Sequence, residues 1–315
     1  MAGLDEFSLI KRLFLPLAAV PESLGLSDDV ALIEGRWAIT ADAIVAGVHF
    51  LPDDPADLIA RKLIRVNLSD LAAKGAEPRF LLLTACFPRE TSAEWLDRFA
   101  SGLKTDCAHF KVALIGGDTV ATPGPLTLSL TALGIVDGTS ALLRSNARSG
   151  DNIWVSGTLG DAALGLRVAK GEAIGLSPEH AGFLLDRYRL PQPRLALGRR
   201  LIGLAHAAMD VSDGLIGDLG HICAASGKSA TIEAELLPRS AAAQGADLAA
   251  LAAGGDDYEV LFTAPPAADA QLAALSVELG LPLTRIGRIG EGEGVRLLGP
   301  DGAEIAGLAG YRHFS

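Results

Sequence analysis

Residues 61–75 read RKLIRVNLSDLAAKG, and their apolar residues recur at the three- and four-residue spacing of a helix. If a helix spans residues 57–74, Leu63, Val66 and Asp70 lie on the face that carries the apolar residues and must pack against a sheet. A carboxylate is costly to bury on such a face unless it meets a cation or several hydrogen-bond donors. We therefore favour metal ligation by Asp70, with a buried aspartate that caps a neighbouring loop as the alternative.

Four further aspartates follow or precede apolar runs or stand beside glycines. They are Asp29 in SDDVALI, Asp42 in WAITAD, Asp118 in LIGGDT and Asp210 in MDVSDG. We expect them at strand ends and helix starts, where α/β and α+β proteins commonly build their sites. No lysine or arginine stands beside them in the sequence, so we expect no neighbouring cation to neutralise them. Because Mg²⁺ takes oxygen ligands and is shared between aspartates and phosphate oxygens, the pattern predicts a metal site that binds a polyphosphate.

Each of these aspartates also has an ordinary structural explanation. Asp29 could lie in a solvated turn, and Asp118 could belong to a glycine-rich turn in which its side chain caps the next segment of the chain. In MDVSDG, Ser212 or Asp213 could cap a helix that begins directly afterwards. The free N–H groups of that helix start would also suit an anion, so both interpretations stay open.

Three other residues are weaker candidates. His49 is flanked by apolar residues in IVAGVHF, where a lone histidine is more often structural than functional. Arg144 and Arg148 stand in the polar segment 137–151 and are the cations that would suit a nucleotide phosphate, although arginines in a surface loop are usually only solvated.

The composition of the 315-residue chain favours a globular protein of two domains. Hydrophobic residues make up 49% and charged residues 21%, and the chain is long enough for two cores. The net charge of −11 argues against nucleic-acid binding, and no apolar stretch is long enough to span a membrane. Three scattered cysteines without CxxC spacing, and a start without the apolar core of a signal peptide, lead us to expect a cytoplasmic protein.

The apolar pattern predicts an α/β (α+β) fold in two domains, 1–140 and 141–315, divided within the polar segment 137–151. In the first domain we expect strands at 30–33, 37–40, 80–87, 112–115 and 126–136, and helices at 57–74 and 92–103. In the second we expect strands at 152–156, 207–211, 230–236, 258–263, 284–289 and 295–298. Its helices are expected at 161–170, 177–189, 193–206, 215–225 and, from an alanine-rich stretch, 240–253.

Taken together, the motifs resemble the thiamine-monophosphate kinase family almost from end to end. In chain order the matching stretches are FSLI, SDDVAL, TADAIVAGVHF, VNLSDLAAKGAEP, IGGDT, LLRSNARSGD, VSGTLGD, MDVSDGLIGDLGHI, GGDDYEVLFT and GYRHF. The wider superfamily includes aminoimidazole-ribonucleotide synthetase and shares an ATP-binding plan. The resemblance implies the two-domain fold of aminoimidazole-ribonucleotide synthetase. It also implies a homodimer, in which the N-terminal α/β domains pair their sheets and a C-terminal α/β sandwich domain completes each active site.

The resemblance also implies roles for single residues. Several Mg²⁺ ions would be bound by Asp29, Thr40, Asp42, Asp70, Asp118, Asp210 and Asp213. ATP, the co-substrate, would meet Gly117, Asp118, Arg144 and Ser212, and thiamine monophosphate would meet His49, Asp256 and Tyr311. Because the acceptor phosphate is already anionic, we expect direct in-line transfer assisted by Mg²⁺, with no residue acting as a general base.

Three positions depart from the family pattern. Before Asp42 the family usually has two hydroxyl residues, and here Ala41 replaces one of them, so one Mg²⁺ loses a ligand unless water takes its place. The usual GGEDYE reads GGDDYE, which shortens the carboxylate at Asp256 by one methylene. The usual glycine before the paired aspartates is Ser27.

We therefore expect ATP-dependent phosphorylation of thiamine monophosphate to thiamine diphosphate, with two alternatives. One is a superfamily sibling that acts on another substrate. Selenophosphate synthetase would need a reactive cysteine early in the chain, and the hydrogenase-maturation protein would need one at its C-terminus, whereas this chain has no cysteine before Cys86 and ends YRHFS. The other alternative is a non-catalytic ATP or thiamine-phosphate binding protein, which Ala41 makes conceivable.

Overall fold

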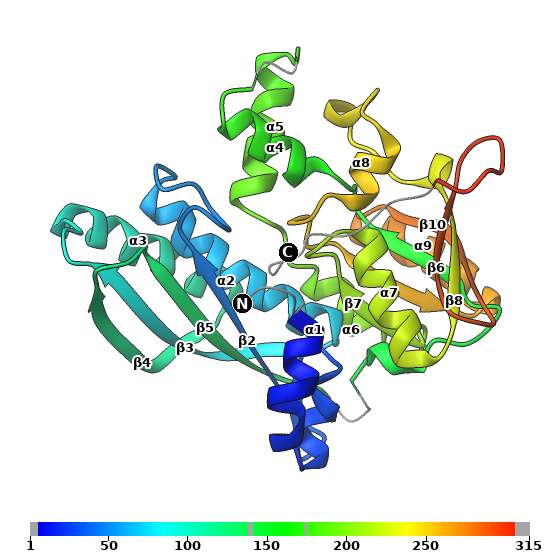
Figure 1. Cartoon of the computed structure of the whole chain (residues 1–315), viewed down its shortest axis with the longest axis horizontal. Helices are drawn as coiled ribbons and strands as arrows, with labels where there is room; N and C mark the ends of the chain where they lie inside the picture. Colours follow the sequence, from blue (N-terminus) through cyan, green and yellow to red (C-terminus); the bar gives the residue numbers. More distant parts are fainter. Residues whose placement is uncertain (1–5, 138–140, 173–174, 306–315) are drawn as a thin grey trace.

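The computed structural model describes residues 6–137, 141–172 and 175–305. It contains two sheets, one from each half of the sequence, and Figure 1 shows the two halves lying side by side. The predicted α/β (α+β) class is therefore confirmed. Among the residues described, no helix has both the length and the apolar character that are needed to cross a lipid bilayer.

The N-terminal sheet has five strands in the order β1-β2-β5-β3-β4. Their bounds are β1 Ala31–Ile33, β2 Trp37–Val45, β3 Glu77–Pro88, β4 Ala113–Thr122 and β5 Thr127–Ile135. Helix α3 (Ala93–Phe110) connects β3 to β4, which makes these two strands parallel, whereas the other pairs are antiparallel. β4 therefore forms one edge of the sheet.

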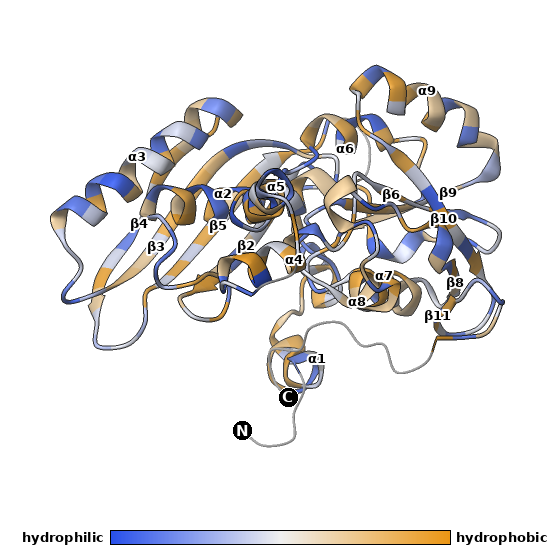
Figure 2. Ribbon diagram, turned by 90° about the horizontal axis from the view of Figure 1, so that it is seen from above, coloured by the Kyte–Doolittle hydropathy of each residue, from blue (hydrophilic) through white to orange (hydrophobic). Residues whose placement is uncertain are grey.

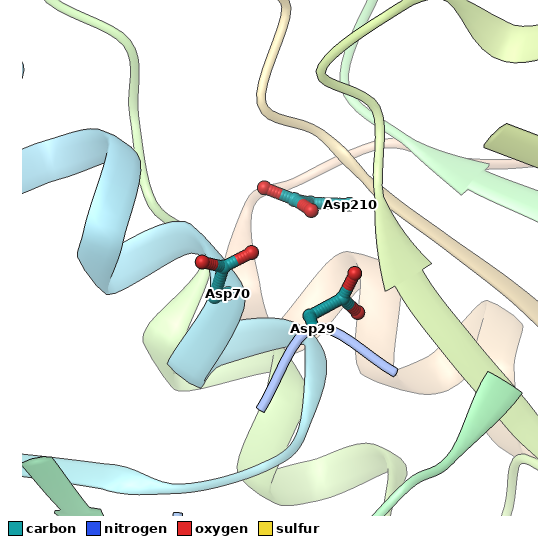
Figure 3. A group of neighbouring side chains, drawn as sticks. All are labelled: Asp29, Asp70 and Asp210. Atoms are coloured by element: carbon teal, nitrogen blue, oxygen red, sulfur yellow. The ribbon is translucent and has the colours of Figure 1, made fainter. Parts of the chain in front are cut away.

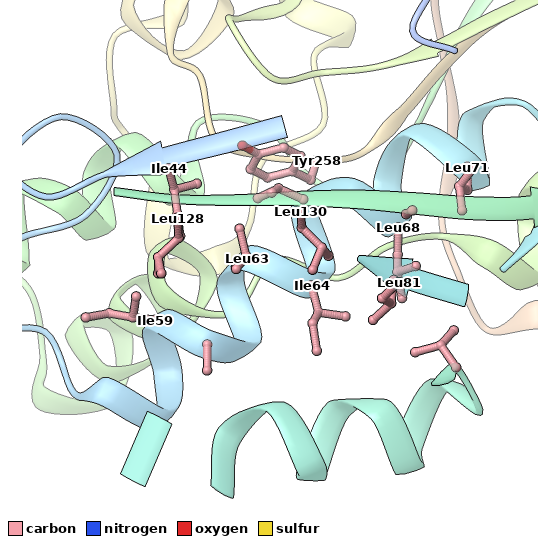
Figure 4. Close-up of a cluster of buried hydrophobic side chains, with 14 of the residues drawn as sticks. Ile44, Ile59, Leu63, Ile64, Leu68, Leu71, Leu81, Leu128, Leu130 and Tyr258 are labelled. Carbon is pink, nitrogen blue, oxygen red and sulfur yellow. The ribbon is translucent and has the colours of Figure 1, made fainter. Parts of the chain in front are cut away.

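Helix α2 (Ala56–Ala73) packs against this sheet, which confirms the helix that we predicted from the apolar spacing of residues 61–75. Leu63 of the helix and Leu130 of β5 belong to one buried cluster, which also includes Tyr258 from the C-terminal half (Figure 4). Burying each aliphatic side chain of this size stabilises the fold by about 1.5–3 kcal/mol. Helix α2 is thus a fixed support for the polar side chains that it carries.

The C-terminal sheet has six strands in the order β11-β8-β10-β6-β9-β7. Their bounds are β6 Asn152–Ser156, β7 Ala207–Asp210, β8 Ser229–Glu233, β9 Val260–Ala264, β10 Leu283–Gly290 and β11 Gly294–Leu298. The helices of this half are α4 Asp161–Ala169, α5 Pro178–Arg189, α6 Leu195–Leu201, α7 Leu215–Ser226, α8 Leu248–Ala253 and α9 Asp269–Leu279. Figure 2 shows α3 and α9 at opposite outer ends of the molecule. Because α2 contacts β7 and α6, the two halves meet along this helix.

Short helical segments precede the first strand. They are α1 Glu6–Leu9, a π-helical turn at Ile10–Phe14, and two 3₁₀ segments at Leu15–Leu17 and Pro21–Leu26. Our sequence interpretation predicted none of them, and it also missed α9. The two N-terminal segments 6–9 and 10–14 each contribute a residue to the wall of the cavity described below.

Two predicted strand ends were wrong, and both concern candidate site residues. β2 continues to Val45, so Asp42 lies inside the strand. β4 runs through the glycines and Asp118 because residues 116–118 pair with residues 82–84 of β3. Gly117 has a φ of +144°, and a Cβ atom there would lie 1.8 Å from the carbonyl oxygen of Leu83. Only glycine therefore allows this strand to continue beside β3.

The predicted helices also needed correction. The expected helix 240–253 is broken, because Ser240 caps a 3₁₀ turn and Asp247 caps the separate helix α8, with Gly245 at a φ of +82° between them. The expected helix 193–206 is reduced to α6, whereas α3 extends seven residues beyond its predicted end at residue 103, to Phe110.

Candidate active site

A cavity of about 670 Å³ lies where the two halves meet, and it collects most of the predicted site residues. The predicted residues in its wall are Asp29, Thr40, Asp42, His49, Asp70, Arg144, Asp210, Ser212, Asp213 and Asp256. They come from the loops before β1 and after β2, from β2, α2 and β7, and from the loops around residues 144, 212 and 256. Tyr311 lies outside the described residues.

Three buried or half-buried carboxylates converge in this cavity, and we call Asp29, Asp70 and Asp210 the carboxylate cluster. Each offers one oxygen atom, and these atoms all lie within 4.8 Å of one another. Figure 3 shows Asp70 on α2, Asp29 on the segment before β1 and Asp210 at the end of β7, with their carboxylates facing a common centre. Thr40 donates a hydrogen bond of 2.6 Å from its Oγ1 atom to Asp70 Oδ2. Three separate elements thus deliver oxygen atoms to one point.

The electrostatics of the carboxylate cluster favour a cation. Burial raises the pKa of Asp70 well above its usual value, and the nearby charges of Asp42 and Asp210 raise it further. Burial also raises the pKa of Asp210 to about 7, with Asp29 adding to the increase. A cation at the centre would oppose both effects, because it stabilises the ionised carboxylates. A donor set made only of oxygen atoms suits a hard divalent cation.

Asp29 already has cationic partners, which corrects our expectation that the aspartates lack neighbouring cations. Lys74 Nζ lies 2.5 Å from Asp29 Oδ2, and the guanidinium of Arg144 contacts Asp29 Oδ1. Lys74 also pairs with Asp28 at 2.7 Å and donates a hydrogen bond of 2.8 Å to the carbonyl oxygen of Ala208. Although burial alone would raise the pKa of Asp29, the charges of Arg144 and Lys74 outweigh it and lower the pKa to about 2.

The loop before α7 is organised by Asp218, a residue that our sequence interpretation missed. Its Oδ2 atom accepts hydrogen bonds from the backbone N–H groups of Ser212, Asp213 and Gly214, at 3.0–3.1 Å. The N-cap of α7 is Gly214, with no side-chain cap, so the structure rules out the alternative that Ser212 or Asp213 only caps this helix. These three N–H groups are directed at Asp218, and Ser212, Asp213 and Asp218 all line the cavity.

A second group of residues, from both halves, lies around Lys62. Its Nζ atom donates a hydrogen bond of 2.9 Å to the carbonyl oxygen of His49 and lies 2.8 Å from Asp256 Oδ2. The same ammonium lies 4.4 Å from the ring centre of Tyr188 on α5. The His49 ring accepts a hydrogen bond at Nδ1 from the backbone N–H of Val45, at 3.1 Å. Two residues with a predicted substrate role, His49 and Asp256, are therefore linked through one lysine.

Gly117 and Asp118 lie away from the cavity of their own chain. Both are exposed on β4, and neither contributes to the cavity wall. Asp42 pairs with Leu130, Leu130 with Leu83, and Leu83 with Gly117. Three strand-to-strand spacings therefore separate Asp42 from Gly117, a distance of about 14 Å across the sheet.

Of the site residues that our sequence interpretation missed, only the two lysines of the α2 region could have been found from a sequence pattern. Lys62 and Asp70 on α2 and Lys74 at its C-cap follow one another at multiples of four residues, so the periodicity that singled out Asp70 also applied to both lysines. Asp218 and His221 also line the cavity and lie on α7, and nothing in their local sequence marks them as cavity residues. Burial lowers the pKa of His221 to about 4, with the Arg144 charge contributing in the same direction.

Comparison with known proteins supports the relation suggested by the motifs. Residues 27–136 match the family model "AIR synthase related protein, N-terminal domain", and residues 148–299 match the corresponding C-terminal domain model. The thiamine-monophosphate kinase of Caulobacter vibrioides is 42% identical over 304 residues, which cover 92% of this chain and 85% of that protein. The enzyme of the same name from Escherichia coli K12 is 41% identical over 323 residues, which cover 98% of each chain.

A solved structure leads to the same conclusion. AaThiL complexed with AMPPCP and TMP superposes with a TM-score of 0.87 and 31% sequence identity, and the match covers 99% of this chain and 97% of that one. The two sheets described above are therefore those of a solved relative. By sequence and by structure, the chain belongs to the thiamine-monophosphate kinase family.

Proposed function

We propose that this protein transfers the γ-phosphoryl group of ATP to thiamine monophosphate and so forms thiamine diphosphate. The observation that carries the proposal is the carboxylate cluster, whose members come from both halves of the chain and meet inside one cavity. Family membership supplies the two substrates, since relatives are named thiamine-monophosphate kinases and one is solved with AMPPCP and TMP. A cavity of about 670 Å³ falls within the usual size range of sites for small molecules and cofactors.

Asp29, Asp70 and Asp210 are the residues that we propose to hold Mg²⁺, with further oxygen ligands from Asp42, Thr40 and Asp213. The support is the donor chemistry, because all of these groups offer oxygen and Mg²⁺ prefers oxygen. Bound there, Mg²⁺ would offset the repulsion between the two phosphate groups and stabilise charge on the transferred phosphoryl group. The raised pKa values of Asp70 and Asp210 agree with a site that is completed by a cation.

The chain itself binds and orients the two substrates. In the proposed step, a phosphate oxygen of thiamine monophosphate attacks the γ-phosphorus of ATP, the bond from that phosphorus to the β–γ bridging oxygen breaks, and ADP leaves. The attacking oxygen is already anionic, so no side chain has to remove a proton. Arg144 has five N–H donors and would turn those not used on Asp29 toward the nucleotide phosphates. Ser212 would contact ATP, and His49 and Asp256 would contact thiamine monophosphate, as would Tyr311.

We further propose a homodimer in which the partner's β4 delivers Asp118 to the site. β4 is exposed along its length and carries three large apolar side chains, Leu114, Ile115 and Val120, that are about half exposed. An edge strand of this kind is a ready surface for pairing with another strand. Since Asp118 lies too far from Asp42 of its own chain, a role on ATP or Mg²⁺ requires a second copy.

The two halves would then have different roles in the site. Residues 1–140 would provide the dimer contact and most of the ATP and Mg²⁺ ligands, and residues 141–315 would complete the site with Asp210, Ser212 and Asp256. The three cysteines are free thiols, which is consistent with our expectation of a reducing cytoplasm.

Product analysis tests the proposed reaction. The purified protein is incubated with ATP, Mg²⁺ and thiamine monophosphate, and the products are separated by chromatography, with a chelator control. Thiamine diphosphate that forms only when Mg²⁺ is present supports both the reaction and the metal. If no product forms while ATP still binds, the proposal fails and a sibling substrate or a non-catalytic role replaces it. An Ala41→Thr variant then distinguishes these two, since it restores the missing hydroxyl.

A further inference from the structure

We propose that Lys62 is a positioning residue for the acceptor substrate, which it serves by holding His49 and Asp256 in place. This inference rests on the proposed function, in which those two residues contact thiamine monophosphate. Lys62 does not line the cavity, so it acts through the groups that do. Its side chain is only 3% exposed, so its ammonium depends on protein partners in place of water.

The partners of Lys62 come from segments that are far apart in the sequence. Helix α2 supplies the lysine, the loop after β2 supplies the carbonyl oxygen of His49, and the loop before β9 supplies Asp256. The ring of Tyr188 on α5 covers the same ammonium at 4.4 Å. One cation therefore connects both halves of the molecule behind one wall of the cavity.

Asp256 needs such support because its backbone is held in an unfavourable conformation. Its φ is +69°, and that of Tyr258 is +51°, in the left-handed region that is unfavourable for residues other than glycine. Two backbone hydrogen bonds of 2.8 Å, from Asp256 N to Ser212 O and from Tyr258 N to Val211 O, fix the main chain. The ion pair with Lys62 fixes the side chain, which stays 28% exposed and lines the cavity.

Tyr188 and Lys62 together hold the loop that contains His49. The hydroxyl group of Tyr188 donates a hydrogen bond of 3.2 Å to Asp54 and accepts one of 3.2 Å from the backbone N–H of Leu51. Lys62 contacts the face of this ring and also binds the carbonyl oxygen of His49. Loss of the ammonium would therefore loosen both acceptor-binding segments together. The candidate ATP contact Arg144 lies on another segment, and the backbone bond from Asp256 N to Ser212 O does not involve the ammonium.

The test compares Lys62→Met with Arg61→Met, a matched control on the same helix. Arg61 is also a cation with an aspartate partner, but its partner Asp106 lies on α3 and keeps its bonds to Arg65. We expect Lys62→Met to raise the KM for thiamine monophosphate by at least ~10-fold and to leave the KM for ATP within ~2-fold of the wild type. Arg61→Met should change neither KM. A purely structural role of Lys62 would lower the melting temperature without separating the two KM values.

A double-mutant cycle tests whether Lys62 acts on the KM for thiamine monophosphate through Asp256. If Lys62 acts through Asp256, the KM effects of Lys62→Met and Asp256→Asn should not add in the double variant. If Lys62→Met does not fold, the same KM comparison is made with Lys62→Gln. This variant loses the charge but keeps a donor for the His49 carbonyl. Equal KM values in the Lys62 and Arg61 variants, with an active wild type, would overturn the inference. A wild type that forms no thiamine diphosphate would instead overturn the proposed function.

Discussion

Lys74 Nζ lies 2.5 Å from the Oδ2 atom of Asp29, and both side chains are almost fully removed from solvent. Burial lowers the pKa of Lys74, but the charges of Asp29 and Asp28 outweigh this effect, so the net pKa is raised and the lysine stays protonated. The carboxylate cluster therefore has unequal members. Asp29 stays ionised because it faces cations, whereas Asp210 holds its proton to about pH 7.

Replacement of Lys74 by methionine should lower the free energy of unfolding by about 3–5 kcal/mol, because Asp28 loses its cation and Asp29 keeps only Arg144. Urea denaturation of the ligand-free protein measures this loss. The matched control is Lys228→Met, which breaks an exposed pair with Glu291 and should change stability far less. Equal losses in the two variants would show that the buried pair contributes no more than a surface pair.

The raised pKa of Asp210 predicts that the metal-free protein loses stability as the pH rises. The unfolded chain releases this proton near the ordinary value of 3.8, whereas the folded chain keeps it to about 7. Between these values the folded state binds more protons, so each step to higher pH favours unfolding. In a chelator, Asp210→Asn should therefore gain stability relative to the wild type between about pH 4 and about pH 7. Urea midpoints across this window measure the difference, and a constant difference would contradict the prediction.

Local spacing was sufficient to predict part of the site. The helical period of residues 61–75 placed Asp70 on the face that packs toward the sheet, and the apolar run before Asp210 placed that residue at the end of a strand. Both predictions depend only on neighbours within one element. The same reasoning gave the α/β class, because the alternation of strands and helices is also local.

The remaining features depend on pairing between distant segments. Asp29 and Lys74 are 45 residues apart in the sequence, and no local pattern shows that one neutralises the other. Asp118 lies within a strand because β3 provides backbone partners for the glycines before it, which a turn-like sequence does not reveal. These contacts follow from the tertiary fold, so sequence reasoning about single motifs could not supply them.

Asp218→Ala should weaken ATP binding as well as stability. The change leaves three backbone N–H groups, those of residues 212–214, without their carboxylate, at a cost of about 1–3 kcal/mol for each buried group that stays unpaired. The loop that carries Ser212 would lose its fixed conformation, so the KM for ATP should rise. The control is Asp247→Ala, which removes a helix cap on α8 but lies outside the cavity wall. If both variants lose stability and neither changes the KM, Asp218 supports only the fold.

Asp42→Asn and Asp118→Asn should each abolish turnover without unfolding the protein, and a mixture of the two should recover activity. If Asp118 serves the partner's cavity, a mixed dimer has one site with both aspartates intact and one site with neither. Random reassembly of equal amounts then gives about a quarter of the wild-type activity, since half of the dimers are mixed and each has one working site. The measurement is thiamine diphosphate formation after the variants are dissociated, mixed and reassembled. Zero activity in mixtures that contain mixed dimers would mean that Asp42 and Asp118 of the same chain serve one site, which the distance across one chain's sheet argues against.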